Sequence, residues 1–245
     1  MAEGSTHSQK AHEFHTRTDP HGQASHLNGL ILGGQDGVVN TLGVILGVAA
    51  ATSDACIVMA AGLAAAFAES VSMGAVAYTT TRADAALYES EMARERRHID
   101  QVPELEREEV REIYRAKGFS GALLEKIVET ITADKEVWLA VMMAEEHKLG
   151  EVPASAALKS ALLVGVSAIV GSLIPLVPFI FLGVTLAMWA SVATAAVVLF
   201  AAGVYKAVTT VGHRMRSGIE MVVIGIASAM VGYLVGVLFK VPITP

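Results

Sequence analysis

Two carboxylates lie inside stretches of sequence that are otherwise apolar. Asp36 falls within residues 27–51, and Glu69 falls in the middle of residues 56–80. A carboxylate in the hydrocarbon of a bilayer is costly unless it is paired, hydrated or bound to a cation. We therefore interpret both as parts of a cation path. The alternative for Asp36 is a helix-start position at the membrane interface, because it is close to the polar N-terminal residues.

Met73 follows Glu69 by four residues, so the two side chains share a helical face. A carboxylate oxygen is a hard ligand and a thioether is a soft one. Transition metals tolerate that mixture better than Mg²⁺ or Ca²⁺ does. The pair therefore favours a transition-metal cargo, and the alternative is a structural pair.

A charged segment, residues 82–159, holds most of the chain's 24 acidic and 18 basic residues. Within it Glu91, Glu95 and His98 are spaced i, i+4, i+7, so they share one stripe of a helix that should end before Pro103. Carboxylates and an imidazole on one stripe are suitable ligands for a divalent transition metal.

Two later helices of this segment carry similar side chains. Glu106 and Glu109 share one face of the first, and Met142 and Met143 precede Glu146 by one turn on the second. Asp134 is the expected N-cap of the second helix, which Gly150 and Pro153 should end. Carboxylates that lie close together raise one another's pKa unless a cation neutralises them. The methionines widen the choice of cation to Fe²⁺, Co²⁺, Zn²⁺ or Mn²⁺. The alternative is that these glutamates serve only solubility.

The elements that position these residues can be predicted from composition. Hydrophobic residues make up 53% of the 245, and the mean hydropathy is +0.52. A helix of about 20 apolar residues crosses the hydrocarbon of a bilayer, and backbone polar groups there must be satisfied within the segment. We predict an all-α membrane protein with five transmembrane helices per protomer and a cytoplasmic helical metal-binding domain. The apolar stretches are residues 27–51, 56–80, 156–182, 186–208 and 218–239.

The domain prediction follows the same boundaries. We expect a polar tail (1–26), two transmembrane helices (27–81), the metal-binding domain (82–155) and three further transmembrane helices (156–245). The tail is predicted to be solvated, with metal binding as the alternative; it contains His7, His12, His15 and His21, with His26 at its end.

Charge and cysteine content add three expectations. The net charge of −6 does not suggest a nucleic-acid partner, and the single cysteine, Cys56, excludes an internal disulfide. Lys and Arg concentrate in the tail, the charged segment and the turn before the last apolar stretch, which places these on the cytoplasmic side.

The N-terminus has no signal-peptide core, so we expect no cleaved leader. This and the alanine-rich spans favour a prokaryotic plasma membrane, with a vacuolar membrane as the alternative.

Small residues and prolines predict how the membrane helices pack. Glycines four apart let helix backbones approach closely, and two prolines should kink the third span. We expect the glycine face of the fifth span to be a subunit contact. The residues concerned are Gly33, Gly37, Gly43 and Gly47, then Gly225, Gly232 and Gly236, and finally Pro175 and Pro178.

Three stretches of the chain carry a resemblance to a known family. They read GGQDGVVNTLGVILG, AESVSMGAVAY and WLAVMMAEE, in this order around the charged segment. From about Leu27 to its C-terminus the chain resembles the vacuolar iron transporter family. That resemblance implies dimers of five-helix protomers with a cytoplasmic metal-binding domain between the second and third spans. It also implies export of Fe²⁺, in some cases Mn²⁺ or Zn²⁺, in exchange for protons.

The resemblance also implies roles for individual residues. Asp36 and Met73 match the family's translocation site, with Glu69 beside them. His98 stands where the family usually has a glutamate, a position for which Glu91 could compensate. The remaining positions that match the family's metal-binding residues are Glu95, Glu106, Glu109, Met142, Met143 and Glu146.

The function predicted from these observations is a proton-coupled divalent-metal antiporter and not an enzyme. Its substrate is Fe²⁺, with Mn²⁺, Zn²⁺ and Co²⁺ as alternatives, and we expect no permanently bound cofactor. Its expected partners are metal ions, protons, the lipid bilayer and a second copy of the chain. The alternative function is a membrane-anchored ferritin-like iron-binding or ferroxidase module. Glu95 and His98 have the E-x-x-H spacing of such sites, but a symmetric two-iron site needs a second pair.

Overall fold

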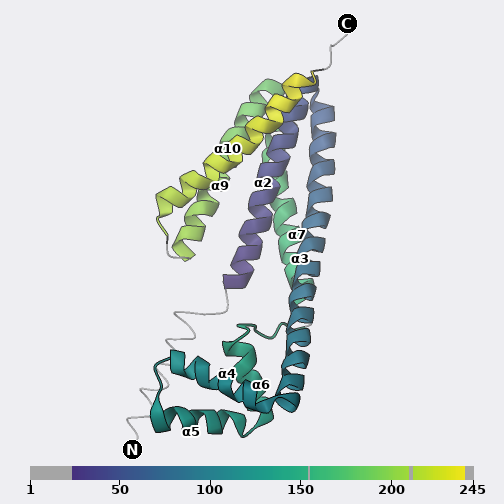
Figure 1. Ribbon diagram of the computed structural model, residues 1–245. Helices are drawn as coiled ribbons and strands as arrows, with labels where there is room; N and C mark the ends of the chain where they lie inside the picture. The colour runs from purple at the N-terminus through teal and green to yellow at the C-terminus, as the bar shows by residue number, and fades with distance from the viewer. Residues whose placement is uncertain (1–23, 154, 210–211, 241–245) are drawn as a thin grey trace, which may run out of the picture. The chain divides into compact units, whose positions relative to one another are not determined.

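The computed structural model describes residues 24–153, 155–209 and 212–240, with side chains from residue 29 onward. Every regular element in this part of the chain is a helix (Figure 1), which confirms the all-α class. The predicted histidine tail, with His7, His12, His15 and His21, lies outside the described residues. The elements are α2 (Ala24–Thr52), α3 (Ala55–Gln101), α4 (Pro103–Ala116), α5 (Gly121–Thr132), α6 (Lys135–Glu145), α7 (Ala156–Leu173), the 3₁₀ turn η1 (Ile174–Leu176), α8 (Val177–Phe181), α9 (Val184–Thr209) and α10 (Arg214–Leu238).

Five helical segments of the described chain are long and apolar enough to cross a membrane, which confirms the predicted number of spans. In the third, α7, η1 and α8 follow one another within a single apolar stretch. The protein is therefore a multi-pass integral membrane protein. The segments are Gly29–Thr52, the apolar part of Ala55–Gln101, Ala156–Phe181, Val184–Thr209 and Arg214–Leu238.

The second span and the first charged helix are one element. The apolar stretch 56–80 and the charged stripe of Glu91, Glu95 and His98 were predicted as separate features, but one helix, α3, carries both and runs for 47 residues without a break. No glycine or proline occurs in it after Gly74, and alanine, glutamate, arginine and methionine favour a helix. The helix ends one residue before Val102, where Pro103 restricts the backbone as predicted.

The chain divides into two compact units, the described parts of Met1–Ala77 with Lys159–Pro245, and Tyr78–Leu158. In the first, α2, α9 and α10 lie side by side (Figure 1). A Cβ built on Gly47 would lie 2.7 Å from the carbonyl oxygen of Gly232, and one on Gly236 would overlap the Gly47 backbone. The predicted close approach of α2 is confirmed. Gly232 and Gly236, which we interpreted as part of a subunit contact, pack on α2 of the same chain. They also line an open groove between α2 and α10 that contains Asp36, so a contact of this groove with a second copy stays a prediction.

Further close approaches and hydrogen bonds join the other spans of this unit. The hydroxyl of Ser70 on α3 donates to the Gly165 carbonyl on α7 at 2.7 Å. The predicted proline irregularity is present, because the α-helix gives way to η1 at Pro175. The Ser191 hydroxyl on α9 donates to the Pro175 carbonyl at 2.6 Å, so this irregular backbone is satisfied by packing.

In the second unit, α4, α5 and α6 and the end of α3 surround an apolar core. Asp134 caps α6 as predicted, accepting from the backbone N–H groups of Glu136 and Val137. Gly118 has a φ of 97° beyond the end of α4, which glycine adopts without strain. The buried core residues are Ile99, Val110, Leu124, Val128, Ile131, Trp138, Leu139, Met142 and Met143.

The last helix of this unit is shorter than expected. We predicted that it runs to Gly150, but α6 ends at Glu145. The backbone N–H of His147 donates to the Met142 carbonyl at 3.3 Å, and Lys148 has a left-handed φ of 54°. This turn redirects the chain immediately after Glu146.

Candidate functional site

Two buried carboxylates form the centre of a cluster in the second unit. Glu95 on α3 and Glu106 on the first turns of α4 are each only 2% exposed. Burial, then the nearby carboxylate of Glu95, then those of Glu109 and Glu146, raise the pKa of Glu106 to about 8. These four glutamates come from α3, α4 and the end of α6, and the fold brings them together.

A histidine faces each central carboxylate. Nδ1 of His98 lies 3.3 Å from Oε1 of Glu106, and Nε2 of His147 lies 3.1 Å from Oε2 of Glu95. The early end of α6 produces the second contact, because the turn at Lys148 follows His147 directly. Had the helix continued, His147 would have lain about 100° around it from Glu146.

The donor atoms of this cluster form two overlapping groups. Those of Glu95, His98 and Glu106 lie within 4.8 Å of one another, and so do those of Glu95, Glu146 and His147. Oε1 of Glu95 and Oε2 of Glu106 are buried and accept no hydrogen bond in the described protein. An unpaired buried carboxylate is strongly unfavourable, and a divalent cation would satisfy both oxygens at once.

The other predicted residues of this unit lie around the cluster in different ways. Burial raises the pKa of Glu146, and the carboxylates of Glu109 and Glu95 raise it further. Met142 and Met143 are buried in the apolar core. Glu91 is paired with Arg94 at 3.0 Å.

Glu69 is the second candidate centre, in the first unit. It is only 8% exposed, and neither of its oxygens accepts a hydrogen bond of good geometry in the described protein, although the side chains of Asn40 and Ser172 lie close enough to interact with it. Its polar neighbours are Asn40 and Asp36 from α2 and Ser172 from α7. The Ser172 hydroxyl is likewise buried without a hydrogen-bond partner in the described part of the chain. Oxygen ligands that lack protein partners, enclosed by apolar helices, are suited to a passing cation or a proton.

Asp36 lies three turns inside α2, which begins at Ala24, so it is not at the start of the helix as the alternative required. It lines a groove of about 620 Å³ with Asn40. The groove then follows α2 past Gly43 and Gly47 and is lined on its other side by α10. Asp36 is exposed to this groove.

Met73 is half-buried on α3, one turn after Glu69. Met73 is associated with Asp36 and Glu69 only through its position on α3, where it shares a helical face with Glu69.

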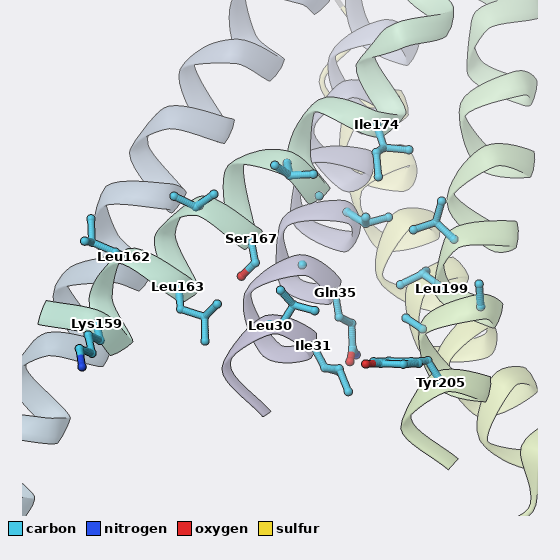
Figure 2. Close-up of a pocket in the computed structure, with 18 residues that line it drawn as sticks. Leu30, Ile31, Gln35, Lys159, Leu162, Leu163, Ser167, Ile174, Leu199 and Tyr205 are labelled. Atoms are coloured by element: carbon cyan, nitrogen blue, oxygen red, sulfur yellow. The ribbon is translucent and has the colours of Figure 1, made fainter. Parts of the chain in front are cut away.

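A larger cavity of the first unit lies elsewhere. It has a volume of about 860 Å³ and lies between α2, α7 and α9 (Figure 2). Figure 2 shows Leu30, Leu163 and Leu199 around it, and its few polar side chains are those of Gln35, Lys159, Ser167 and Tyr205. Neither Asp36 nor Glu69 lines it. Because it offers no carboxylate, we exclude it as the cation site.

The comparison with known proteins agrees with the helix pattern. The sequence profile described as the VIT family matches residues 27–237, which includes all five spans and the charged unit. The chain belongs to the VIT family.

Curated relatives of this VIT family member cover most of both chains. Vacuolar iron transporter 1 of Arabidopsis thaliana is 32% identical over 204 residues, 82% of this chain and 81% of the relative. Vacuolar iron transporter 1 of Oryza sativa subsp. japonica is 28% identical over 225 residues, 91% and 89%. The vacuolar iron transporter of Plasmodium falciparum (isolate 3D7) is 28% identical over 251 residues, 95% and 91%.

Sequence reasoning missed two members of these candidate sites. His147 follows Glu146 directly. In the helix that we expected to reach Gly150, its side chain would have pointed away from Glu95, so we did not include it. Ser172 lies in an apolar stretch that gave no reason to single it out. The signal for His147 was the sequence Glu-Glu-His at a helix end, where a left-handed residue can reverse the chain.

Proposed function

We propose that this VIT family member exports divalent metal, with Fe²⁺ as the main cargo, from the cytosol in exchange for protons. The observation that carries this proposal is Glu69, a buried carboxylate with two unpaired oxygens among apolar membrane helices. Membership in a family of transporters, with relatives named as iron transporters, supports iron as substrate and transport in place of catalysis. Mn²⁺, Zn²⁺ and Co²⁺ are the secondary cargo.

In this mechanism the two carboxylate sites act in series. The cluster of Glu95, Glu106 and Glu146 collects metal from the cytosol, and Asp36 and Glu69 receive it within the membrane. A proton and a metal ion compete for the same carboxylate oxygens, so protonation on the acidic side releases the metal. Alternating access then couples the two fluxes.

The proposed setting is a dimer with the charged unit and the N-terminus in the cytosol. The clustering of Lys and Arg supports that orientation. The groove at Asp36 is open along α2 and α10, and a second copy placed against it would enclose the path. The alanine-rich spans favour a prokaryotic plasma membrane, and the vacuolar relatives make a vacuolar membrane the alternative.

The experiment is Fe²⁺ uptake into proteoliposomes with an acidic lumen, under reducing conditions. We expect uptake by the unmodified protein and at least a tenfold loss in Asp36→Asn, which keeps the size of the side chain but removes its charge. Asp54→Asn is the matched control, because Asp54 is exposed and only accepts from the N–H groups of Cys56 and Ile57, which asparagine can also do. Uptake by Asp36→Asn at the control rate would refute the proposed path.

The same samples address the ferritin-like alternative. With Fe²⁺ and oxygen, the transporter is expected to show no catalytic turnover of Fe²⁺ to Fe³⁺. Turnover abolished by Glu95→Gln would favour the ferroxidase function instead.

A further inference from the structure

The cluster of the second unit contains His147, which contacts Glu95, a partner that the sequence did not indicate. His147 is half-buried and presents Nε2 to Oε2 of Glu95 at 3.1 Å. The contact joins residues 52 positions apart and depends on the turn after α6. Donor atoms of two imidazoles, those of His98 and His147, thus lie within 4.8 Å of a carboxylate oxygen of Glu95.

The geometry of this group fits a metal ion as well as an ion pair. Donor atoms of Glu95, Glu146 and His147 lie within 4.8 Å of one another. In a tetrahedral Zn²⁺ site with bonds of about 2.1 Å, neighbouring donor atoms are about 3.4 Å apart. The separation of 3.1 Å between His147 Nε2 and Glu95 Oε2 is close to that value, and a rotation of the Glu146 side chain would bring its oxygen to a similar distance.

A second observation shows that the histidine contact does not complete the site. Glu95 is only 2% exposed, and its other oxygen, Oε1, is buried with no hydrogen-bond partner among the described residues. If His147 served only to pair with Glu95, half of that carboxylate would stay unsatisfied. A carboxylate that is shared by two groups of donor atoms, and that has one oxygen still unpaired, is suited to bridge two cations.

We propose that His147 is a metal ligand. With Glu95 and Glu146 it forms a second metal position, beside the one made by Glu95, His98 and Glu106. The two imidazoles make the cluster prefer Zn²⁺, Co²⁺ and Fe²⁺ over Mn²⁺. The inference deepens the proposed function, on which it rests. Imidazole nitrogen favours Zn²⁺ and Fe²⁺, whereas sites built only from carboxylates and water suit Mn²⁺. The histidines therefore act as a selectivity element ahead of the membrane path.

The test uses the full-length protein in detergent, with Zn²⁺ and Mn²⁺ as the probes. Competition titrations give the ratio of the two affinities, and zinc X-ray absorption counts bound imidazoles through their scattering signature. In His147→Gln, which keeps an N–H donor for Glu95, we expect the Zn²⁺ affinity of the second position to fall at least tenfold, the Mn²⁺ affinity to change less than threefold, and one imidazole to be lost. His213→Gln, at an exposed histidine before α10, is the matched control and should match the unmodified protein.

Two further variants keep the outcomes distinct. Glu95→Gln removes the shared ligand and should abolish binding at both positions, which also isolates any zinc held by other histidines. His147→Asp replaces nitrogen by oxygen and should shift the preference toward Mn²⁺ at least tenfold, a gain that misfolding cannot produce.

If Glu95→Gln abolishes binding but His147→Gln and His147→Asp bind both metals like the unmodified protein, this inference fails and the proposed function stands. If Glu95→Gln changes nothing, the collecting cluster of the proposed function fails as well.

Discussion

Replacing Glu106 by glutamine should make the metal-free protein more stable at neutral pH while weakening its hold on metal. The pKa of Glu106 is raised from 4.5 to about 8, chiefly by burial and then by Glu95. Between these two pH values the folded protein binds more protons than the unfolded chain, so the free energy of unfolding falls as the pH rises through this window. Each pH unit there costs about 1.4 kcal/mol, so the loss from pH 5 to pH 7 is about 2–3 kcal/mol.

Glu106→Gln removes this titration and keeps the shape of the side chain. Because 1 kcal/mol corresponds to about 2–4 °C, the difference in melting temperature between pH 5 and pH 7 should shrink by roughly 4–12 °C. The assay is thermal unfolding of the full-length protein in detergent with a chelator present. Zn²⁺ affinity, measured in parallel at pH 7, should fall at least tenfold because a ligand is lost.

Glu125→Gln is the control for this experiment. Glu125 is fully exposed, and Arg111 lowers its pKa. The pairing with Arg111 therefore stabilises the folded protein at pH values above the usual pKa of a glutamate, and this stabilisation is lost as the pH falls through the lowered pKa. Its replacement should not narrow the difference between pH 5 and pH 7. If Glu106→Gln keeps the full pH dependence of the unmodified protein, Glu106 is not held unpaired in the interior and the description of the cluster is wrong.

Three further predictions concern packing, capping and metal affinity. Gly236→Val places a side chain against the backbone of Gly47, so we expect a clear drop in melting temperature in detergent. Gly183→Ala is the control, because its added Cβ would meet no atom within 4 Å, and it should melt like the unmodified protein. Asp134→Ala removes the cap of α6 and should destabilise the charged unit by about 1 kcal/mol, seen as faster amide hydrogen exchange in that helix. Metal binding must deprotonate Glu106, so Fe²⁺ affinity should rise about tenfold per pH unit up to pH 8 and then level off, which anaerobic titrations measure.

The helices and their packing faces could be predicted because their signals are local. Apolar length identified five spans, and glycines four apart indicated where α2 would meet another helix. Pro103 and Asp134 marked helix ends through backbone and capping chemistry that involves only adjacent residues. The identity of the partner helix was not local, so the face at Gly232 and Gly236 was assigned to a second copy when it packs on α2.

The candidate sites could be predicted only in part for the same reason. Glu95, Glu106 and Glu146 share helical faces that the sequence displays, and the fold brings them together across three helices. Whether a polar or charged residue is buried and unpaired depends on tertiary structure, as Ser172 and Glu69 illustrate. His147 was missed because one left-handed residue, Lys148, changes the direction of the chain and leaves no periodic trace in the sequence.

The most direct test of the account is simultaneous measurement of metal entry and lumenal pH in proteoliposomes that contain Glu69→Gln or the unmodified protein. If cation and proton share the Glu69 oxygens, the unmodified protein will take up Fe²⁺ as protons leave the acidic lumen, and Glu69→Gln will lose both fluxes together. Unchanged, proton-coupled Fe²⁺ uptake by Glu69→Gln would contradict the claim that this buried carboxylate holds the transported ion.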